Sequence, residues 1–242
     1  MDVMKKFIED FRSGLAIVHE DNDLIVVSKP CGIASIPERQ PTGNDLLSIL
    51  SREMNRKLYV VHRLDKDVSG VIIFAKNPET HKFLNRLFES RMVEKTYVAL
   101  VYGCVSEKEG FIRAPLRRFG SGRVGVDYKK GKESLTYFRV LKRYNFCTLL
   151  SVSPKTGRSH QIRVHLYHIG HPIIGDPLYG KIKATQMESE VGALNYFNHP
   201  RLMLHALSLR FTIDGTSRRF FKSSLPNDFR YILKKILACG DI

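Results

Sequence analysis

Short runs of β-branched and aromatic residues, each bounded by residues that favour turns, constrain the fold of this chain more than any other feature. Runs of this kind predict strands, and short turns between them predict antiparallel pairs. We expect strands at Ala16–Val18, Leu24–Val27, Leu58–Val61, Val71–Ala75, Thr96–Tyr102, Thr136–Leu141, Cys147–Val152 and Leu204–Phe211. Because these strands outnumber the helices, the pattern favours an α+β fold, with a mainly antiparallel mixed sheet flanked by helices and loops, over a doubly wound fold.

Helix signals stand at four places. The segment Gly43-Asn44-Asp45 could cap a first helix, Asn77 suits the N-cap position of a second, and Pro78 suits its first position. Two more helices are expected at about Ser159–Ile169 and Asp228–Leu237. No linker rich in Pro, Gly or Ser divides the chain, so we expect one domain over residues 1–242 with its core at about 15–230.

The helix expected at Ser159–Ile169 has two distinct sides. Its apolar residues share one side and suit a core: Ile162, Leu166 and Ile169. His160 and Arg163 lie three residues apart on another side and could reach a common site. The alternative is a surface helix with an ordinary basic face.

The chain is strongly basic, with 39 Lys and Arg against 24 Asp and Glu and a formal net charge of +15. Between Phe111 and Arg163 stand 13 basic residues and only two acidic ones, with aromatic residues interleaved. Phosphates need cations and unstacked bases need aromatic faces, so this composition suits nucleic acid. The alternative is a solvated basic face on strands whose aromatic residues belong to the core.

Several classes of protein are disfavoured. The chain has no run of 18 apolar residues that would predict a membrane span, and its amino terminus has no apolar stretch typical of a secretory signal. The cysteines are scattered, which predicts reduced thiols in a cytoplasmic protein rather than a disulfide framework: Cys31, Cys104, Cys147 and Cys239.

Two motifs are weaker than they look. Gly120–Gly125 matches the glycine spacing of a dinucleotide site, but it lacks the flanking strand and helix, and we expect a flexible basic loop or hairpin there. Four histidines stand close together between His160 and His171. They lack the i, i+4 pair with a glutamate that a helical zinc site uses, so no metal is expected.

The segment Val60–Val71 is different, because two apolar runs enclose a loop that holds a histidine, cations and carboxylates. A carboxylate at the end of a strand beside fixed cations stays ionised. It can act as a nucleophile or a base without a cofactor. The alternative is a salt-bridged turn.

Five segments together resemble the RluA family of pseudouridine synthases. They cover most of the chain from Ala16 to Phe229 in family order, and four long motifs in register are specific. The segments are Leu24–Gly32 (LIVVSKPCG), Val61–Gly70 (VHRLDKDVSG), Glu94–Gly103 (EKTYVALVYG), Thr156–Leu166 (TGRSHQIRVHL) and Gly170–Gly180 (GHPIIGDPLYG).

The resemblance implies a pseudouridine-synthase-type domain with an active-site cleft across its sheet and no metal or organic cofactor. It implies isomerisation of a uridine flipped out of structured RNA, in 23S rRNA or tRNA or both. Asp65 would be the catalytic aspartate, Tyr97 would lie against the uracil, and Arg163 would pair with Asp65. Arg63 would help to extrude the uridine.

Other residues receive RNA-binding or supporting roles. His62, Arg158, His160 and Gln161 fall within the resembling motifs, and Arg117, Arg118, Lys129 and Lys130 are expected to hold phosphates. Val68 stands where the family usually has threonine. Fewer than 20 residues precede the first expected strand, so no S4 domain is expected. A monomer without membrane attachment is the simplest expectation.

Two rival functions remain. One is a non-catalytic RNA-binding protein or RNA chaperone on the same fold, although a binder gains nothing from Asp65 beside phosphates. The other is a basic nuclease or glycosidase, which would need a second carboxylate near Asp65. Asp67 is the local candidate, and we interpret it as structural or exposed.

Overall fold

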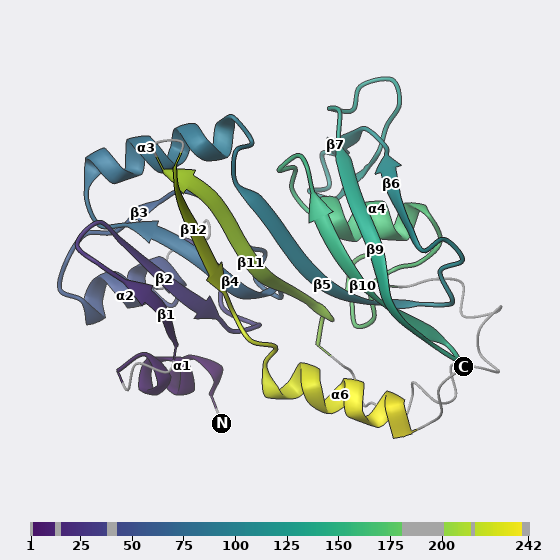
Figure 1. The fold of residues 1–242 in the computed structure, drawn as a ribbon, viewed down its shortest axis with the longest axis horizontal. Helices are drawn as coiled ribbons and strands as arrows, with labels where there is room; N and C mark the ends of the chain where they lie inside the picture. Colours follow the sequence, from purple (N-terminus) through teal and green to yellow (C-terminus); the bar gives the residue numbers. More distant parts are fainter. Residues whose placement is uncertain (1, 13–15, 38–42, 181–200, 214–215, 239–242) are drawn as a thin grey trace. The chain divides into compact units, whose positions relative to one another are not determined.

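The computed structural model describes residues 2–12, 16–37, 43–180, 201–213 and 216–238. It comprises two compact units (Figure 1). The first unit contains residues 1–95 and 205–225, and the second contains residues 96–204 and 226–242. Whether the two units form the one catalytic domain expected from the sequence depends on how they are arranged, so that expectation stays a prediction.

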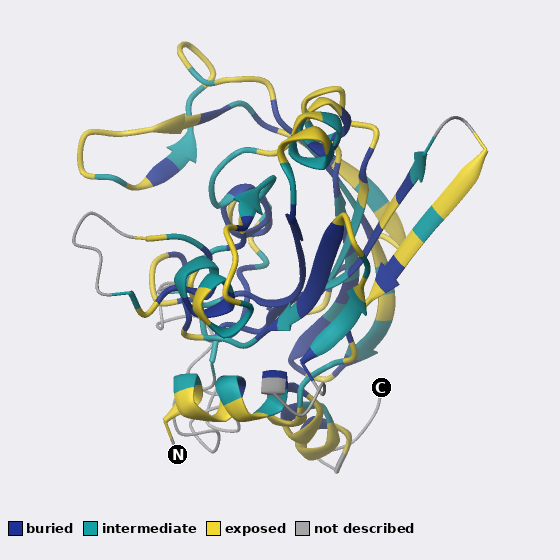
Figure 2. Cartoon of the chain, turned by 90° about the vertical axis from the view of Figure 1, so that its left-hand side faces the viewer, coloured by how far each residue is buried: buried dark blue, intermediate teal, exposed yellow. Residues whose placement is uncertain are grey.

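The first unit is built on a mixed sheet. Its strands are β1 (Ile17–Glu20), β2 (Leu24–Lys29), β3 (Tyr59–Val60), β4 (Ser69–Ala75), β11 (Leu204–Ile213) and β12 (Ser217–Lys222). Of β11, the residues from His205 onward belong to this unit. The order is β1-β2-β4-β11, with β12 beside β11 and β3 beside β4. Only the β4–β11 pair is parallel among these. β4 is apolar after its first residue, Ser69, and is buried at every position; buried residues are dark blue in Figure 2.

Three helices belong to this unit: α1 (Val3–Arg12), α2 (Leu46–Glu53) and α3 (Pro78–Glu89). The predicted caps are confirmed, since Asp45 accepts a hydrogen bond from the Ser48 amide and Asn77 accepts one from Thr80. Helix α1 was not expected from the sequence. Phe7 and Phe11 lie one helical turn apart and are both buried, which explains its amphipathic character.

The second unit is built on an antiparallel sheet. Its strands are β5 (Glu94–Tyr102), β6 (Glu109–Arg113), β9 (Leu135–Tyr144) and β10 (Cys147–Pro154), in the order β5-β10-β9-β6. Of β5, the residues from Thr96 onward belong to this unit. A separate hairpin joins β7 (Leu116–Arg118) to β8 (Val124–Val126), and the helices are α4 (Gln161–His168) and α6 (Asn227–Ala238). Strands β6, β7, β8 and β12 were not expected as such, because β6, β7 and β12 are interrupted by charged residues and β8 has only three residues.

Helix α4 differs from the surface helix that was one alternative. Six consecutive residues from Gln161 to Leu166 are buried, so the helix is covered on all sides. It also begins two residues later than expected. His160 has a left-handed backbone (φ 51°), which sets the start of the helix at Gln161.

The predicted α+β fold with a mainly antiparallel mixed sheet is confirmed. In the described part of the chain, no helix is long and apolar enough to cross a membrane. The same residues contain no group of His, Cys, Asp or Glu side chains that could hold a metal ion. Cys31, Cys104 and Cys147 are free thiols, and Cys239 lies outside the described residues.

Candidate functional site

Asp65 lies in the loop between β3 and β4 of the first unit, which we call the aspartate loop (residues 61–68). Leu64 and Val68 are buried at 6% and 3% exposure, while Arg63 is exposed and Asp65 partly exposed. The Val68 amide donates to the Asp65 carbonyl at 3.1 Å, which closes a tight turn. The two apolar side chains anchor the loop on either side of Asp65. The valine in place of a threonine therefore fits an apolar site.

A buried lysine, Lys29, bonds to the backbone of the aspartate loop. Lys29 is 1% exposed, and its Nζ donates to the carbonyl oxygens of Pro30 (3.0 Å), Ile33 (2.7 Å) and Lys66 (2.9 Å). An ammonium group has three donors and is costly to bury unless they are satisfied, so three carbonyl acceptors suit it. The backbone directly after Asp65 is thereby tied to the segment after β2. Sequence reasoning assigned no role to Lys29.

A second tie comes from Ser35. Its hydroxyl donates to the Leu64 carbonyl at 2.7 Å, and the Leu64 amide approaches the same oxygen at 3.0 Å. The Gly32 amide donates to the Lys66 carbonyl at 2.9 Å. These bonds leave little freedom to the backbone that carries Asp65.

The far end of the aspartate loop enters β4 through Ser69 and Gly70. Gly70 has φ +122°, and a Cβ there would lie 2.2 Å from the Ala206 carbonyl oxygen on β11. Only glycine fits this close approach. Ser69 bonds to Nδ1 of His205 at 2.8 Å, and His205 Nε2 reaches the Ser223 carbonyl at 3.2 Å. Since a carbonyl only accepts, Nε2 carries the proton and Nδ1 accepts from Ser69.

His62 begins the aspartate loop and is held by protein contacts. Its Nε2 accepts a hydrogen bond from the Ile73 amide at 3.2 Å, and its ring stacks on Phe88 at 4.6 Å between centroids. Burial, with a smaller effect of Lys95, lowers the pKa of His62 to about 3. The ring is therefore neutral at pH 7, and its contacts fit the supporting role.

In the second unit, Arg163 on α4 forms a buried ion pair with Asp176. Its Nε and Nη2 lie 2.7 and 2.8 Å from the two carboxylate oxygens, and the residues are 3% and 5% exposed. The amides of Leu178 and Tyr179 donate to the same carboxylate. Burial acts to raise the pKa of Asp176, but the bonds from Arg163 and the two amides lower it overall. This bidentate geometry fixes the plane of the guanidinium.

Tyr179 is shared by several of the polar groups around Arg163. His160 Nδ1 lies 2.9 Å from the Tyr179 hydroxyl, and the Val124 amide donates to that oxygen at 3.2 Å. The Arg163 guanidinium carbon lies 5.2 Å from the centre of the tyrosine ring, a cation–π distance. His160 and Arg163 thus contact one side chain, as their spacing suggested.

Asp176 and Tyr179 were missed as functional residues. Both stand in the segment Gly170–Gly180, which was recognised only as part of the resemblance. The available signal was an aspartate followed by a tyrosine within an otherwise apolar stretch, which is too weak to identify a partner in another segment.

A buried polar network positions α4 on the sheet. Gln161 Nε2 donates to the Leu135 carbonyl and to Thr136 Oγ1, both at 3.0 Å. His165, fully buried, bonds to Thr136 Oγ1 at 2.8 Å and to the Ala114 carbonyl at 2.9 Å. Gln161 is 3% exposed, so its position fits the supporting role better than RNA contact.

Tyr97 lies on β5 and is partly exposed. Its register partner is Val152, which pairs in turn with Phe138. Phe138 is two residues from Thr136, so these side chains share the sheet face that α4 covers. Tyr97 and Arg163 therefore belong to the same side of the sheet of the second unit.

Asp65 belongs to the first unit, and Tyr97 and Arg163 belong to the second. The pairing predicted for Asp65 and Arg163 depends on how the units are arranged and stays a prediction. A guanidinium carries five N–H donors. The bidentate bond to Asp176 is therefore compatible with a second carboxylate.

The hairpin β7–β8 and the turn after it carry exposed cations, which we call the basic hairpin (residues 116–132). Four of its cations are those expected to hold phosphates: Arg117, Arg118, Lys129 and Lys130, all exposed. Asp127 accepts the amides of Lys129 and Lys130 and pairs with Arg117 at 3.0 Å. This acid therefore shapes the turn.

The glycine-rich motif forms the loop of this hairpin. A Cβ on Gly125 would lie 3.0 Å from the Phe119 ring, so the glycine lets the ring lie flat on the strand. Of the two expected forms, flexible loop or hairpin, the structure shows a hairpin, and no helix follows it as a dinucleotide site requires.

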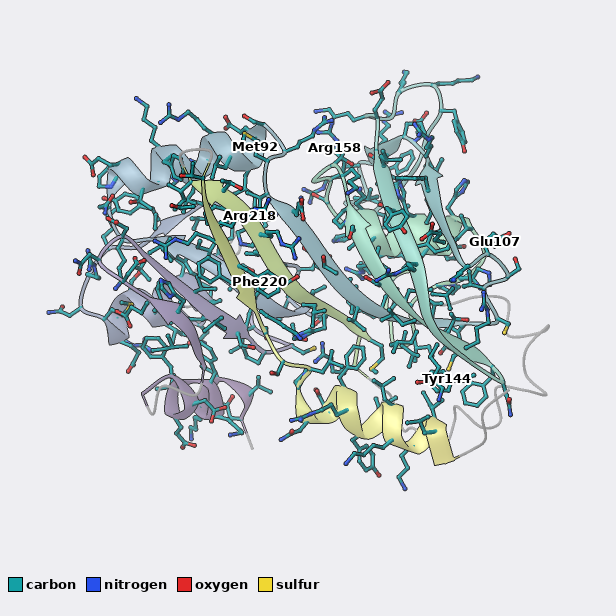
Figure 3. The ribbon with its side chains drawn as sticks, in the orientation of Figure 1. Met92, Glu107, Tyr144, Arg158, Arg218 and Phe220 are labelled. Atoms are coloured by element: carbon teal, nitrogen blue, oxygen red, sulfur yellow. The ribbon has the colours of Figure 1, made fainter. Side chains whose placement is uncertain are left out.

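The base of the hairpin packs against the Arg163 region. Leu116 and Val124 form one buried cluster with Val164 and Tyr179. Arg158, labelled in Figure 3, lies on the loop before α4, and its Nε approaches the Glu133 carbonyl at 3.4 Å. Cations and α4 are thus brought together within the second unit.

The aromatic residues between Phe111 and Arg163 were expected either to contact nucleic acid or to belong to the core, and the structure shows both kinds of environment. Phe138, Tyr144 and Phe146 are buried, as the core interpretation expects. Tyr128 is 71% exposed, which fits contact with a partner.

Comparison with protein families matches residues 23–168 to the model described as RNA pseudouridylate synthase. Among curated proteins, the chain is 36% identical over 229 residues to ribosomal large subunit pseudouridine synthase D of Nitrosomonas europaea, covering 92% of this chain and 65% of that protein. It is 36% identical over 197 residues to the dual-specificity RNA pseudouridine synthase RluA of Vibrio cholerae, covering 81% and 76%. The chain thus spans about two thirds to three quarters of these relatives.

Comparison of structures finds the same fold in human RNA pseudouridylate synthase domain containing 4. The TM-score is 0.78 with 22% identity, over 97% of both chains. A second human protein, RNA pseudouridylate synthase domain containing 1, gives a TM-score of 0.69 with 24% identity, over 94% of this chain and 96% of the other.

Proposed function

This chain belongs to the RluA family of pseudouridine synthases, and we propose that it converts specific uridines of structured RNA to pseudouridine. The observation that carries the proposal is the placement of Asp65 in a loop tied down by Lys29 and Ser35. A loop that merely connects two strands does not need a buried ammonium group beneath it. A catalytic carboxylate does need a fixed backbone.

In the proposed reaction, the target uridine leaves the base stack, which costs a few kcal/mol. The carboxylate of Asp65 acts at the sugar in one of two ways. It attacks C1′, so that the C1′–N1 bond breaks and an ester between Asp65 and C1′ forms, or it removes a sugar proton, so that the C1′–N1 bond breaks and a glycal forms. The uracil then rotates and C5 bonds to C1′, as the ester to Asp65 breaks or the glycal takes back its sugar proton. The C5 proton is lost and N1 gains a proton.

The other site residues bind and orient. Arg163, held in plane by Asp176, pairs with Asp65 in this proposal and keeps the carboxylate oriented. Tyr97 lies against the detached uracil and confines it while it rotates. Arg63, exposed on the aspartate loop, fills the space that the uridine leaves in the stack.

The substrate in this proposal is a stem-loop of 23S rRNA, of tRNA or of both. The names of the two curated relatives refer to the ribosomal large subunit and to dual specificity, which supports ribosomal RNA as a substrate and leaves room for a second one. The exposed cations of the basic hairpin support contact with phosphates. We place the enzyme in the cytoplasm as a monomer.

Tritium release from RNA that carries 5-tritiated uridine tests the reaction. In vitro transcribed tRNAs and 23S rRNA fragments are the probes. We expect release by the unmodified protein and none by Asp65→Asn, with RNA binding by Asp65→Asn unchanged within about twofold. Asp67→Asn is the matched control, because it changes a neighbouring carboxylate of the same loop.

The outcomes separate the two functions. Release by Asp65→Asn equal to that of the unmodified protein would remove Asp65 from the reaction. Binding of these RNAs by the unmodified protein, with no release from any of them or from total cellular RNA, would favour the non-catalytic RNA-binding alternative.

A further inference from the structure

The sheet of the second unit exposes two aromatic rings side by side. Phe111 on β6 and Tyr137 on β9 are register partners. Their ring centroids lie 5.1 Å apart with 51° between the planes. Phe111 is 55% exposed and Tyr137 is partly exposed. We call this pair the aromatic platform.

The aromatic platform lies on the sheet face opposite α4. Successive residues of a strand point to opposite faces, and Thr136, next to Tyr137, contacts Gln161 and His165 of α4. In Figure 1, α4 lies behind β9 and β10 in the second unit. Because Tyr97 shares the face of Thr136, the platform is not part of the proposed uridine site.

Cations surround the platform. The Arg113 guanidinium carbon lies 5.8 Å from the centre of the Phe111 ring. Arg139 lies two residues from Tyr137 on β9, and Lys155 follows β10 with its amide bonded to the Leu135 carbonyl. All three cations are exposed.

The platform has one acidic neighbour and an open side. Glu109 accepts a hydrogen bond from the Tyr137 hydroxyl at 2.5 Å, and Arg139 is its register partner across the strands. On the other side, Ser153 is the register partner of Tyr137. A serine is too small to cover the ring of Tyr137. Three cations and one anion give this surface a net positive charge.

We propose that the aromatic platform binds a single-stranded segment of the RNA, outside the site that holds the target uridine. The inference rests on the proposed function only for the choice of RNA as substrate. Sheets that present aromatic residues on neighbouring strands stack two or three unpaired bases in other RNA-binding proteins. Stacking tolerates any base, and the flanking cations meet the phosphates between the stacked bases.

Fluorescence anisotropy with two labelled probes tests the proposal. One probe is a 12-nucleotide single-stranded RNA of mixed sequence, and the other is a blunt RNA duplex of 12 base pairs. We expect the double variant Phe111→Ala, Tyr137→Ala to bind the single strand at least about tenfold more weakly, since base stacking on aromatic residues is lost. Duplex binding should stay within twofold.

Two matched controls accompany the double variant. Tyr231→Ala removes a tyrosine that is 59% exposed on α6 of the same unit, and it should leave single-strand binding within twofold. Tyr137→Phe removes the hydroxyl that bonds Glu109 but keeps the ring, and it should bind like the unmodified protein. Thermal unfolding checks that each variant is folded.

A loss of less than fivefold in the double variant overturns the proposal, as does an equal loss in Tyr231→Ala. An equal loss for both probes also overturns it, because stacking requires unpaired bases. Single-turnover tritium release from a short stem-loop should be unchanged in the double variant. If the unmodified protein releases no tritium, the proposed reaction fails, while the anisotropy result still decides the platform.

Discussion

The Lys29 ammonium group donates its hydrogen bonds to backbone carbonyl groups. Its three carbonyl partners tie Lys66, the residue after Asp65, to Pro30 and Ile33 in the segment after β2. We expect Lys29→Met to remove these three hydrogen bonds and to lower the free energy of unfolding by about 2–3 kcal/mol. Turnover should fall more than RNA affinity, because Asp65 loses its fixed position.

Urea unfolding and tritium release measure the two effects. Lys66→Met is the control, because it removes an exposed lysine of the same loop. A Lys29→Met protein with unchanged turnover would show that the lysine does not position Asp65.

Gly70 shows a steric requirement at one residue. Gly70→Ala combines an unfavourable φ with a backbone clash at 2.2 Å, so β4 and β11 must separate where the aspartate loop ends. We expect a loss of more than about 3 kcal/mol. Gly170→Ala is the matched control, because Gly170 has φ +85° with no atom within 4 Å of a Cβ. It should cost only about 1 kcal/mol, and equal losses by urea unfolding would contradict the clash.

His62 makes stability depend on pH. Its pKa is about 3 in the folded protein against an ordinary value of 6.5, so below pH 6.5 the unfolded chain takes up a proton that the folded protein does not. Folding therefore weakens as the pH falls from 6.5 towards 3. At pH 5 the effect of this group is about 2 kcal/mol.

His62→Phe keeps the stack on Phe88 and removes the titrating group. Its free energy of unfolding should fall less between pH 7.5 and pH 5 than that of the unmodified protein. Parallel pH profiles for the two proteins would refute the role of His62.

At the scale of the element, hydrogen bonds from buried polar side chains hold α4 against the sheet. An amphipathic helix usually presents apolar residues on its buried side. Spacing along the sequence correctly indicated that His160 and Arg163 reach a common place. It could not indicate that Gln161 and His165 are buried, because their partners Thr136 and Ala114 lie in other segments. Burial of a polar side chain depends on partners brought close by folding, and a local pattern contains no information on them.

The ion pair of α4 should respond to acid. The pKa of Asp176 is lowered in the folded protein, so its contribution to stability is present above its ordinary value of 3.8 and is lost as the pH falls through the folded value. We expect Asp176→Asn to lower the free energy of unfolding at pH 7 by about 3 kcal/mol, since the buried Arg163 loses the charge of the carboxylate that accepts two of its hydrogen bonds. The difference from the unmodified protein should shrink below pH 4, and a constant difference would contradict the assignment.

The basic hairpin should act on affinity and its salt dependence. Lys129→Gln with Lys130→Gln should weaken RNA binding and lower the slope of log affinity against log salt by about 1–2, with turnover at saturating RNA unchanged. Lys234→Gln with Lys235→Gln is the matched control, because these exposed lysines are also consecutive but lie on α6. Equal slopes for the two double variants would place the phosphates elsewhere.

At the scale of the molecule, the sequence predicted the fold class, most strands and both helix caps, because these depend on local patterns. It missed α1, the strands β6, β7 and β12, where charges interrupt the apolar alternation, and β8, which has only three residues. It named Asp65, Tyr97 and Arg163 through long motifs. It did not find Asp176, Tyr179 or Lys29, whose importance lies in contacts across the fold.

The parallel pair of β4 and β11 has a consequence for the order in which the protein is made. Ser69 and Gly70 are translated long before their partners His205 and Ala206, with the whole of residues 96–204 between them. Domains generally fold from the amino terminus during synthesis. Here the end of the aspartate loop must wait for β11, although Lys29 and Ser35, which hold Leu64 and Lys66, are already present. A nascent chain that stops short of β11 therefore lacks the pairing of Ser69 and Gly70, and the carboxyl end of the aspartate loop is fixed only after β11 has been translated.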